Sequence, residues 1–380
     1  MKNVNQSFLR SGKLILSLLM LAVLFSFVAA QSNDDESLPT ASSMKSRAAS
    51  ASAVKEFEKA RLRSDLLRSI ENASPKAAEA NVVYQRTSHS SYNDNPADIF
   101  FVGKNQYEVD SESNKIVQFG PRPRTIDDPE PTAVDFTQHC SPKPLRQMAI
   151  EYASKYSSLP LAQLTESVTD KDGVVYFFRW ETDTKKFDGL PAFVQIGLSC
   201  GGDLVSYTNT LDLKENQSQD RSVPSEAQSL SVGGVYIFAN NGTNYDQYGP
   251  ARYWWTTNNE GYCSTRFATW CNPKYMRYTY ESWNLSNYAT WDHPGFEGNL
   301  GTHKIFIPRV NATARWASYF IIYGGAGSAS FALDQLSYSN VWVQTRTLRS
   351  INFTQLSDTP FAFQSPSGKK VAFDEIQVVY

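Results

Sequence analysis

Residues 289–325 read ATWDHPGFEGNLGTHKIFIPRVNATARWASYFIIYGG, and this stretch decides the fold of the C-terminal half. It contains two β-prone runs, Thr302–Pro308 and Trp316–Tyr323, with Gly, Pro and Asn residues between and around them. Similar short runs recur from residue 231 to 380, and no helical hydrophobic period interrupts them. Such spacing over about 150 residues is typical of an all-β sandwich or jelly roll. The other runs are Gly234–Phe238, Tyr275–Tyr280, Ala329–Leu333, Val341–Thr345, Ile351–Gln355 and Val371–Val379.

The preceding region, residues 82–213, has a mixed α+β pattern. Apolar residues at helical spacing between Leu145 and Tyr156 predict one helix, which ends before Pro160. A helix laid over an antiparallel meander is the economical way to bury both apolar faces. The polar stretch 214–230 is the predicted linker to the second domain. The predicted strands of the region are Ile99–Val102, Gln106–Val109, Ile116–Phe119, Leu164–Val168, Val174–Trp180, Ala192–Leu198 and Leu204–Thr208.

The N-terminus has the pattern of a secretory signal peptide. Lys2, Arg10 and Lys13 precede a mostly apolar run, and small residues lie ahead of a cleavage point after Ala30. An uncleaved membrane anchor is the alternative, because the apolar run is near the lower length limit for a span. Both alternatives place residues 31–380 outside the cytoplasm. Residues 31–81 are predicted to form a flexible leader followed by one amphipathic helix over 51–71.

The composition of the chain limits the kinds of partner that it can bind. The chain of 380 residues has a formal charge of −2, so it lacks the basic footprint of a nucleic-acid-binding protein. Its four cysteines are an even number in an oxidising context, and the domain boundaries favour Cys140–Cys200 and Cys263–Cys271 among three pairings. No CxxC motif or His ligand spacing predicts a metal site, and no cofactor is expected. Sequons for N-glycosylation occur at Asn72, Asn216, Asn241, Asn284, Asn311 and Asn352.

Residues 82–213 resemble the PepSY-type domain of secreted metallopeptidase propeptides and YpeB-like proteins. The resemblance rests on a helix, a hairpin that ends in FFRW (177–180), and DGLPAFVQIGLSCGGDLVSY (188–207). The segment NQYEVDSESNKIVQFG (105–120) has a similar strand-turn-strand ending and is read as the remnant of a preceding copy. The resemblance implies a non-catalytic inhibitory or chaperone-like element, although no protease domain is recognisable after it.

Residues 231–380 resemble the golvesin C-terminal-like domain, a sandwich similar to carbohydrate-binding modules. The resemblance rests on the order of several segments rather than on one motif. It implies a secreted binding domain. The segments are YMRYTYESW (275–283), residues 289–325 quoted above, ALDQLSYSNVWVQTRTLRSINF (332–353) and KKVAFDEIQVVY (369–380).

Aromatic side chains are the candidate binding residues. Sandwiches that bind carbohydrate place exposed rings against the C–H faces of sugars, while nearby polar groups bind the hydroxyls. Tyr253, Trp254 and Trp255 are consecutive, so an extended backbone turns some of them outward. Tyr262 and Trp270 lie in or beside the Cys263–Cys271 loop, and a disulfide there would stiffen it.

No catalytic motif is recognisable. The sequence has no GxSxG, HExxH or phosphate-binding loop, and we expect no enzyme activity. The expected function is a secreted, non-catalytic protein that binds an extracellular glycan, cell-wall polymer or matrix ligand through 231–380. Two alternatives stay open: a protease inhibitor or assembly factor that binds a secreted peptidase through 82–213, and a polysaccharide hydrolase that uses a carboxylate pair. The hydrolase candidates are Glu281, Asp292, Glu297, Asp334, Asp374 and Glu375.

Overall fold

The computed structural model describes residues 82–93, 95–113, 115–128, 134–187, 190–214, 235–240, 242, 244–258, 260–262, 275–283, 287–293 and 298–380. These residues are mostly β-sheet with one α-helix, and their strands form several antiparallel sheets. All of the described residues belong to one compact unit. The predicted signal peptide, leader and amphipathic helix, and most of the predicted linker, lie outside the described residues.

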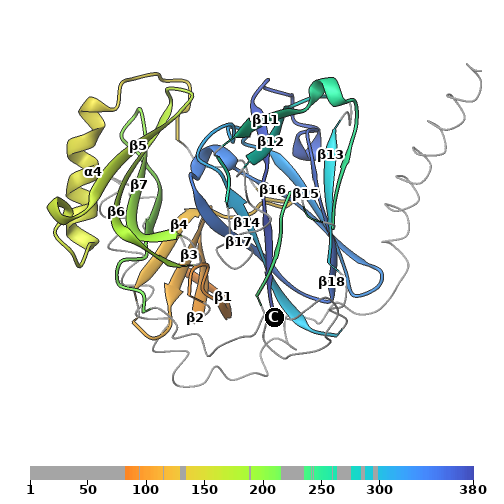
Figure 1. The fold of residues 1–380 in the computed structure, drawn as a ribbon, viewed down its shortest axis with the longest axis horizontal. Helices are drawn as coiled ribbons and strands as arrows, with labels where there is room; N and C mark the ends of the chain where they lie inside the picture. The colour runs from red at the N-terminus through yellow and green to blue at the C-terminus, as the bar shows by residue number, and fades with distance from the viewer. Residues whose placement is uncertain are drawn as a thin grey trace, which may run out of the picture. The chain divides into compact units, whose positions relative to one another are not determined.

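An eight-stranded antiparallel sheet forms the first part of the described chain, in the order β1-β2-β3-β4-β8-β7-β6-β5 (Figure 1). It consists of two four-stranded meanders. They meet where Gln118 and Phe119 of β4 pair with Thr208 and Tyr207 of β8. The strands are β1 (Val82–His89), β2 (Pro96–Val102), β3 (Asn105–Asp110), β4 (Ile116–Pro121), β5 (Thr165–Lys171), β6 (Val175–Phe187), β7 (Leu190–Ser199) and β8 (Leu204–Asn209).

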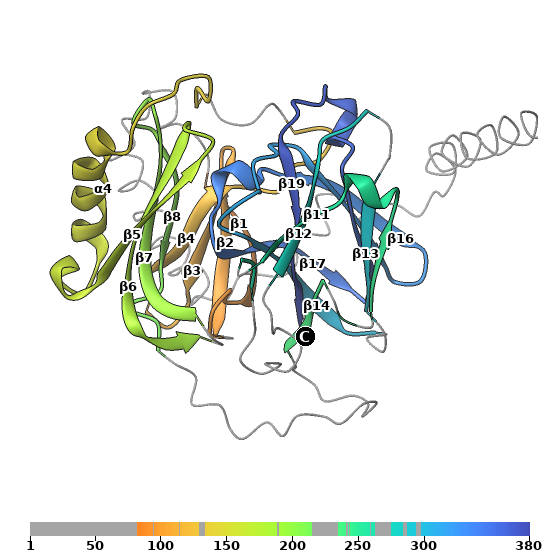
Figure 2. The same cartoon turned by 45° about the horizontal axis from the view of Figure 1, so that its top comes forward.

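The helix α4 (Lys143–Tyr156) packs on the second meander (Figure 2). Leu145, Ala149 and Ala153 recur every four residues, so they lie on one side of the helix, and all three are buried in one core with the apolar side chains of the sheet. The helix agrees with the sequence prediction. The disulfide Cys140–Cys200, with a Cα–Cα distance of 5.6 Å, ties the segment before the helix to the end of β7, and this predicted pairing is confirmed.

Three further antiparallel sheets form the second part of the described chain. Their strand orders are β10-β13-β18-β15-β16, β17-β14-β20-β9 and β11-β12-β19. The strands are β9 (Val235–Phe238), β10 (Tyr245–Tyr248), β11 (Trp255–Asn258), β12 (Tyr275–Tyr280), β13 (Tyr288–Asp292), β14 (Leu300–Ile307), β15 (Ala317–Tyr323), β16 (Gly327–Leu333), β17 (Val341–Arg349), β18 (Ile351–Ser357), β19 (Lys370–Phe373) and β20 (Ile376–Val379).

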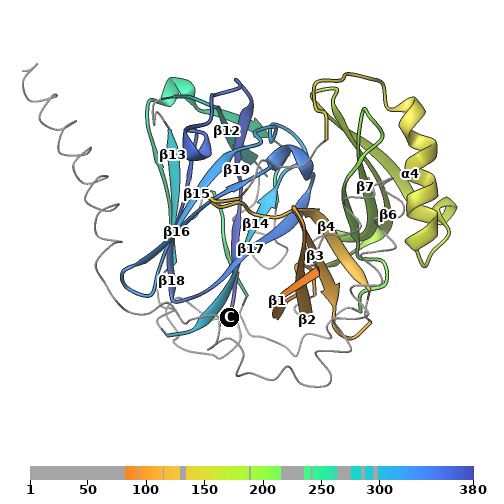
Figure 3. The same cartoon turned by 180° about the vertical axis from the view of Figure 1, so that it is seen from behind.

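One hydrophobic core joins these three sheets, as expected for a sandwich-like arrangement. It takes Trp291 and Tyr319 from the five-stranded sheet, Ile305 and Val343 from the four-stranded sheet, and Phe373 from the three-stranded sheet. The pairing of β14 with β17 can be followed in Figure 3. The alternating apolar residues that predicted these strands therefore lie on the side of each sheet that faces the core.

The last predicted strand, Val371–Val379, is in fact two strands. Asp374 and Glu375 separate β19 from β20, and the two strands belong to different sheets. The carbonyl of Glu375 accepts a hydrogen bond from the amide of Phe306, so the break is stabilised by the neighbouring strand β14. The segment VAFDEIQVV (371–379) contains no Gly or Pro to signal a turn, and for this reason the sequence pattern did not reveal the break.

Glutamine side chains of the eight-stranded sheet bind the backbone of β17. Gln106 of β3 donates to the carbonyl of Gln344 at 3.0 Å, and Gln118 of β4 donates to the carbonyl of Trp342 at 3.0 Å. All four residues are buried. Buried amides need such partners, so these bonds fix the register between the sheet and β17.

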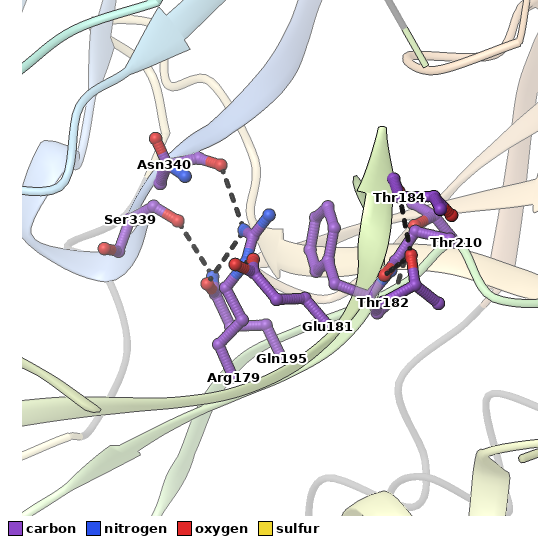
Figure 4. Close-up of polar contacts among 10 residues, drawn as sticks. Arg179, Glu181, Thr182, Thr184, Gln195, Thr210, Ser339 and Asn340 are labelled. Carbon is purple, nitrogen blue, oxygen red and sulfur yellow. Dashed lines mark hydrogen bonds and ion pairs between the residues drawn. The ribbon is translucent and has the colours of Figure 1, made fainter. Parts of the chain in front are cut away.

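The second meander makes the same kind of contact with the loop before β17 (Figure 4). Gln195 donates to the carbonyl of Ser339 at 2.9 Å, and the guanidinium of Arg179 donates to the carbonyl of Asn340 at 3.3 Å. Burial lowers the pKa of Arg179, and its ion pair with Glu181 at 2.7 Å acts in the opposite direction. This face of the eight-stranded sheet is therefore occupied by the chain itself.

Lys171 is a buried cation in the same contact region. Its ammonium donates to the carbonyls of Pro308 at 3.1 Å and Ala312 at 2.9 Å, and the residue is only 1% exposed. Burial lowers the pKa of Lys171 to about 7, while the carboxylates of Asp172 and Asp334 act against this shift. The contact thus includes a group whose charge depends on pH near neutrality.

Candidate functional site

The three-stranded sheet β11-β12-β19 places three aromatic side chains on one surface. Trp255 of β11 pairs directly with Tyr278 of β12, and Tyr280 follows two residues later on the same strand. Directly paired residues, and residues two apart, point to the same side of a sheet. We call Trp255, Tyr278 and Tyr280 the aromatic face.

The rings of the aromatic face touch one another at two angles. The rings of Trp255 and Tyr278 are nearly parallel, with 21° between their planes and 5.7 Å between their centroids. The ring of Tyr280 is perpendicular to that of Trp255, at 89° and 4.9 Å. Trp255 is 36% exposed and Tyr280 is 41% exposed, while Tyr278 is half-buried. The three rings therefore pack against one another, and two of them keep more than a third of their surface exposed.

A row of polar side chains lies beside the aromatic face. The amide nitrogen of Asn311 donates to the hydroxyl of Thr257 at 2.8 Å, and the amide oxygen of Asn311 accepts from the ammonium of Lys370 at 2.9 Å. Lys370 pairs directly with Tyr280, and its Nζ lies 5.4 Å from the ring centroid of Tyr278. We call Thr257, Asn311 and Lys370 the polar row. It supplies donors and acceptors of the kind that bind sugar hydroxyls.

Of the predicted binding residues, Trp255 belongs to the aromatic face, whereas its two neighbours differ in exposure. Tyr253 is 39% exposed, and the guanidinium of Arg252 lies 4.8 Å from its ring centroid. Trp254 is half-buried against Phe373, and its indole nitrogen donates to the carbonyl of Tyr248 at 3.1 Å. The structure thus leaves Trp255 and Tyr253 more accessible to a ligand than Trp254.

Tyr262 lies in the interior of the protein. Its ring packs against Phe306 and Trp342 at centroid distances of 4.9 Å each, and it is 4% exposed. We therefore do not include Tyr262 in the candidate site. Trp270, Cys263 and Cys271 lie outside the described residues, so the predicted second disulfide and its loop remain predictions.

Sequence reasoning did not select Tyr278 and Tyr280. A signal for them was present, because the alternation in YMRYTY (275–280) puts Tyr278 and Tyr280 on one side of the strand. What the sequence did not provide was the strand register that brings Trp255 opposite Tyr278. A second pair of tyrosines, Tyr248 and Tyr288, stacks with 4.6 Å between ring centroids. Tyr248 is exposed and Tyr288 is half-buried, and their strands β10 and β13 belong to a different sheet.

Several carboxylates considered for hydrolysis have structural contacts. Asp374 is buried and accepts from the backbone amide of Tyr262 at 3.0 Å. Asp334 accepts from the amide of Leu336 at 3.1 Å, and burial raises its pKa while Arg315 acts in the opposite direction. Glu281 is also buried, and accepts from the amide of Ser367 at 2.8 Å. Glu297 lies outside the described residues, and Asp292 is exposed.

Two histidines come together inside the sandwich. The hydroxyl of Thr354 lies 2.8 Å from Nε2 of His293 and 3.0 Å from Nε2 of His303, and Nδ1 of His303 contacts the hydroxyl of Thr345 at 2.7 Å. Burial lowers the pKa of His303 to about 3, and it also lowers the pKa of His293, with His303 as a second cause. The pair is neutral at ordinary pH and serves the packing of the core.

Two features are absent from the described residues. No group of three or more His, Cys, Asp or Glu side chains in this part of the chain is arranged to hold a metal ion. Among the same residues, no helix combines the length and the apolar character needed to cross a bilayer.

Comparison with known proteins gives no sequence relative. No protein-family model matches the chain, and no curated protein matches it either. Among solved structures, the neighbours include the C-terminal domain of Bacillus megaterium YpeB, at 9% identity and a TM-score of 0.29, with 61% of this chain and 91% of that one covered.

Proteins that bind or cleave carbohydrate are also among the structural neighbours. A Paenibacillus xanthan lyase has 10% identity and a TM-score of 0.30, and the match covers 80% of this chain and 37% of the lyase. A β-sandwich carbohydrate-binding module has 11% identity and a TM-score of 0.20, with 79% and 94% covered. Glycoside hydrolases are further neighbours. At these identities and TM-scores, the structural likeness establishes neither a family nor a function for this chain. The described residues themselves form a mostly β protein of antiparallel, sandwich-like sheets.

Proposed function

We propose that this chain is a secreted, non-catalytic protein that binds a glycan through the aromatic face. The observation that carries the proposal is the clustering of Trp255, Tyr278 and Tyr280 on one surface of β11-β12-β19, with two of the rings more than a third exposed. Contiguous exposed apolar surface often marks a binding site, and sugar C–H groups are attracted to the π faces of aromatic rings.

The polar row supports the same function. A sugar stacked on a ring presents hydroxyl groups at its rim, and these need partners once water is displaced. Thr257, Asn311 and Lys370 are already held in place by their mutual hydrogen bonds. Side chains that are ordered before binding lose less entropy when the ligand arrives.

The two family resemblances found in the sequence are compatible with this proposed function and assign a role to each domain. We infer that residues 82–213 form a PepSY-like accessory domain, in which α4 covers the second meander, and that residues 231–380 form a golvesin-like binding domain. The face of the eight-stranded sheet opposite the helix contacts β17 and its preceding loop through Gln118, Gln195 and Arg179. An inhibitor that acts through 82–213 would therefore have to use another surface, such as α4 or the outer edge of β5.

The test compares two tyrosines of equal exposure. Tyr280→Ala removes a ring of the aromatic face, and Tyr84→Ala removes a ring of β1 that is 40% exposed, against 41% for Tyr280. The full-length protein and both variants are applied to an array of extracellular and cell-wall glycans, and the dissociation constant of each hit is measured by calorimetry. We expect Tyr280→Ala to weaken binding about tenfold or more, as for other aromatic hot spots, and Tyr84→Ala to change it less than about twofold.

Trp255→Ala provides a second variant on the same surface, and its effect should equal or exceed that of Tyr280→Ala. Circular dichroism and thermal unfolding establish that each variant is folded. A folded wild-type protein that binds no glycan on the array, or that binds equally well without either ring, would refute the proposal. Binding of a secreted peptidase that persists in Trp255→Ala would instead favour the inhibitor alternative.

A further inference from the structure

We propose that the aromatic face prefers a saccharide that carries an anionic group, and that Lys370 is the residue that binds this group. This inference rests on the proposed glycan-binding function and deepens it. The feature behind it is one ammonium group placed beside the rings of Tyr278 and Tyr280, with no carboxylate partner among the described residues.

The position of Lys370 follows from the strand register. Lys370 of β19 is directly opposite Tyr280 of β12, so both side chains lie on the same side of the sheet. Its Nζ is 5.4 Å from the ring centroid of Tyr278 and 6.0 Å from that of Tyr280. A ligand stacked on these rings would therefore lie within reach of the ammonium.

The bonding of Lys370 leaves its charge uncompensated within the described residues. Its ammonium donates to the neutral amide oxygen of Asn311, and no ion pair joins it to a carboxylate in this part of the chain. An ammonium has three N–H donors, so two are left after the bond to Asn311.

Neighbouring cations differ from Lys370 in this respect. Lys369 forms an ion pair with Asp172 at 2.8 Å, and Arg309 forms one with Glu260. Of these three cations, only Lys370 has no carboxylate partner among the described residues, and a ligand carboxylate or sulfate would provide one.

The experiment separates the contribution of the Lys370 charge to saccharide affinity from the contribution of stacking on the aromatic face. Glycan arrays that contain uronate, sulfated and neutral saccharides of matched length are probed with the full-length wild type, Lys370→Gln, Lys370→Arg and the control Lys369→Gln. Gln can keep the hydrogen bond to Asn311 while it removes the charge, and Lys369→Gln changes the net charge by the same amount at the adjacent residue. Salt is then varied on the strongest hit.

We expect the wild type to prefer an acidic saccharide and to lose affinity as salt increases. Lys370→Gln should weaken binding of that saccharide about three- to tenfold and change binding of its neutral counterpart less than about twofold. Lys370→Arg should retain the preference, and Lys369→Gln should leave both affinities unchanged.

The outcomes distinguish the two proposals. Binding of neutral saccharides alone, lost in Trp255→Ala but unchanged in Lys370→Gln, would overturn the charge preference and leave the glycan-binding function in place. An acidic preference that persists in Lys370→Gln would also overturn it. No binding of any saccharide by the folded wild type would refute the glycan-binding function itself. The comparison of uronate with sulfated hits identifies the anionic group.

Discussion

Lys171→Met tests whether a buried ammonium controls the pH dependence of stability. In the native protein Lys171 is fully buried, and its pKa is lowered to about 7 by burial. In the unfolded chain the pKa of a lysine is about 10.4. Between these two values the unfolded state binds more protons than the native state, so the free energy of unfolding must rise as pH increases. The stabilisation is complete above the unfolded pKa and is lost as pH falls toward the native one.

The size of the effect follows from the two pKa values. Each unit of difference corresponds to about 1.4 kcal/mol, and integration from about pH 7.5 to pH 9.5 gives a rise of about 2.5 kcal/mol in the free energy of unfolding. His293 and His303, whose pKa values are lowered, affect stability only below about pH 6.5 and so lie outside this window. Tyrosines with raised pKa values, such as Tyr319, begin to oppose the rise near the upper end of the window, and Lys171→Met corrects for them because it contains the same tyrosines.

Urea unfolding at several pH values across this window measures the effect. Across this window the free energy of unfolding of the wild type should rise by about 2.5 kcal/mol relative to that of Lys171→Met. Met also leaves the carbonyls of Pro308 and Ala312 without their donor, so it should cost about 1–3 kcal/mol per carbonyl at high pH, where wild-type Lys171 is neutral. Lys104→Met is the control for an exposed lysine. The reasoning is refuted if the wild type shows no rise, or if Lys171→Met keeps the full slope.

Three other predictions concern the stability of the two cores. Replacing both Cys140 and Cys200 by Ser opens a cross-link between residues 60 positions apart, and we expect a loss of about 3–4 kcal/mol in the free energy of unfolding, measured by urea titration against the wild type with and without reductant. Thr354→Val keeps the side-chain shape but removes the hydroxyl that contacts both His293 and His303, so it should cost roughly 1–3 kcal/mol at neutral pH; an unchanged midpoint would contradict the proposed role of that hydroxyl. Because the pKa values of both histidines are lowered in the folded protein, wild-type stability should also fall as pH drops below about 6.5, and thermal unfolding between pH 7 and pH 4 checks the direction.

The local sequence pattern was sufficient to predict the helix and most of the strands in the described residues. The helical spacing from Leu145 to Tyr156 predicted α4, and the alternation of apolar residues in runs such as Val341–Thr345 predicted strands, because both periods are imposed by the backbone over a few neighbouring residues. Strands that were missed, such as β10 and β13, have only four or five residues and carry a weak period.

The candidate site depended on contacts that no local pattern contains. The sequence identified Trp255 as an aromatic residue in an extended stretch, and the oxidising context and predicted domain boundaries favoured the Cys140–Cys200 pairing. Only the tertiary structure brought Tyr278 opposite Trp255 and Lys370 opposite Tyr280, and only it buried Tyr262. The reason is physical: strand register is set by packing between segments up to about a hundred residues apart in the chain, whereas secondary structure is largely set by side chains within a few residues of one another.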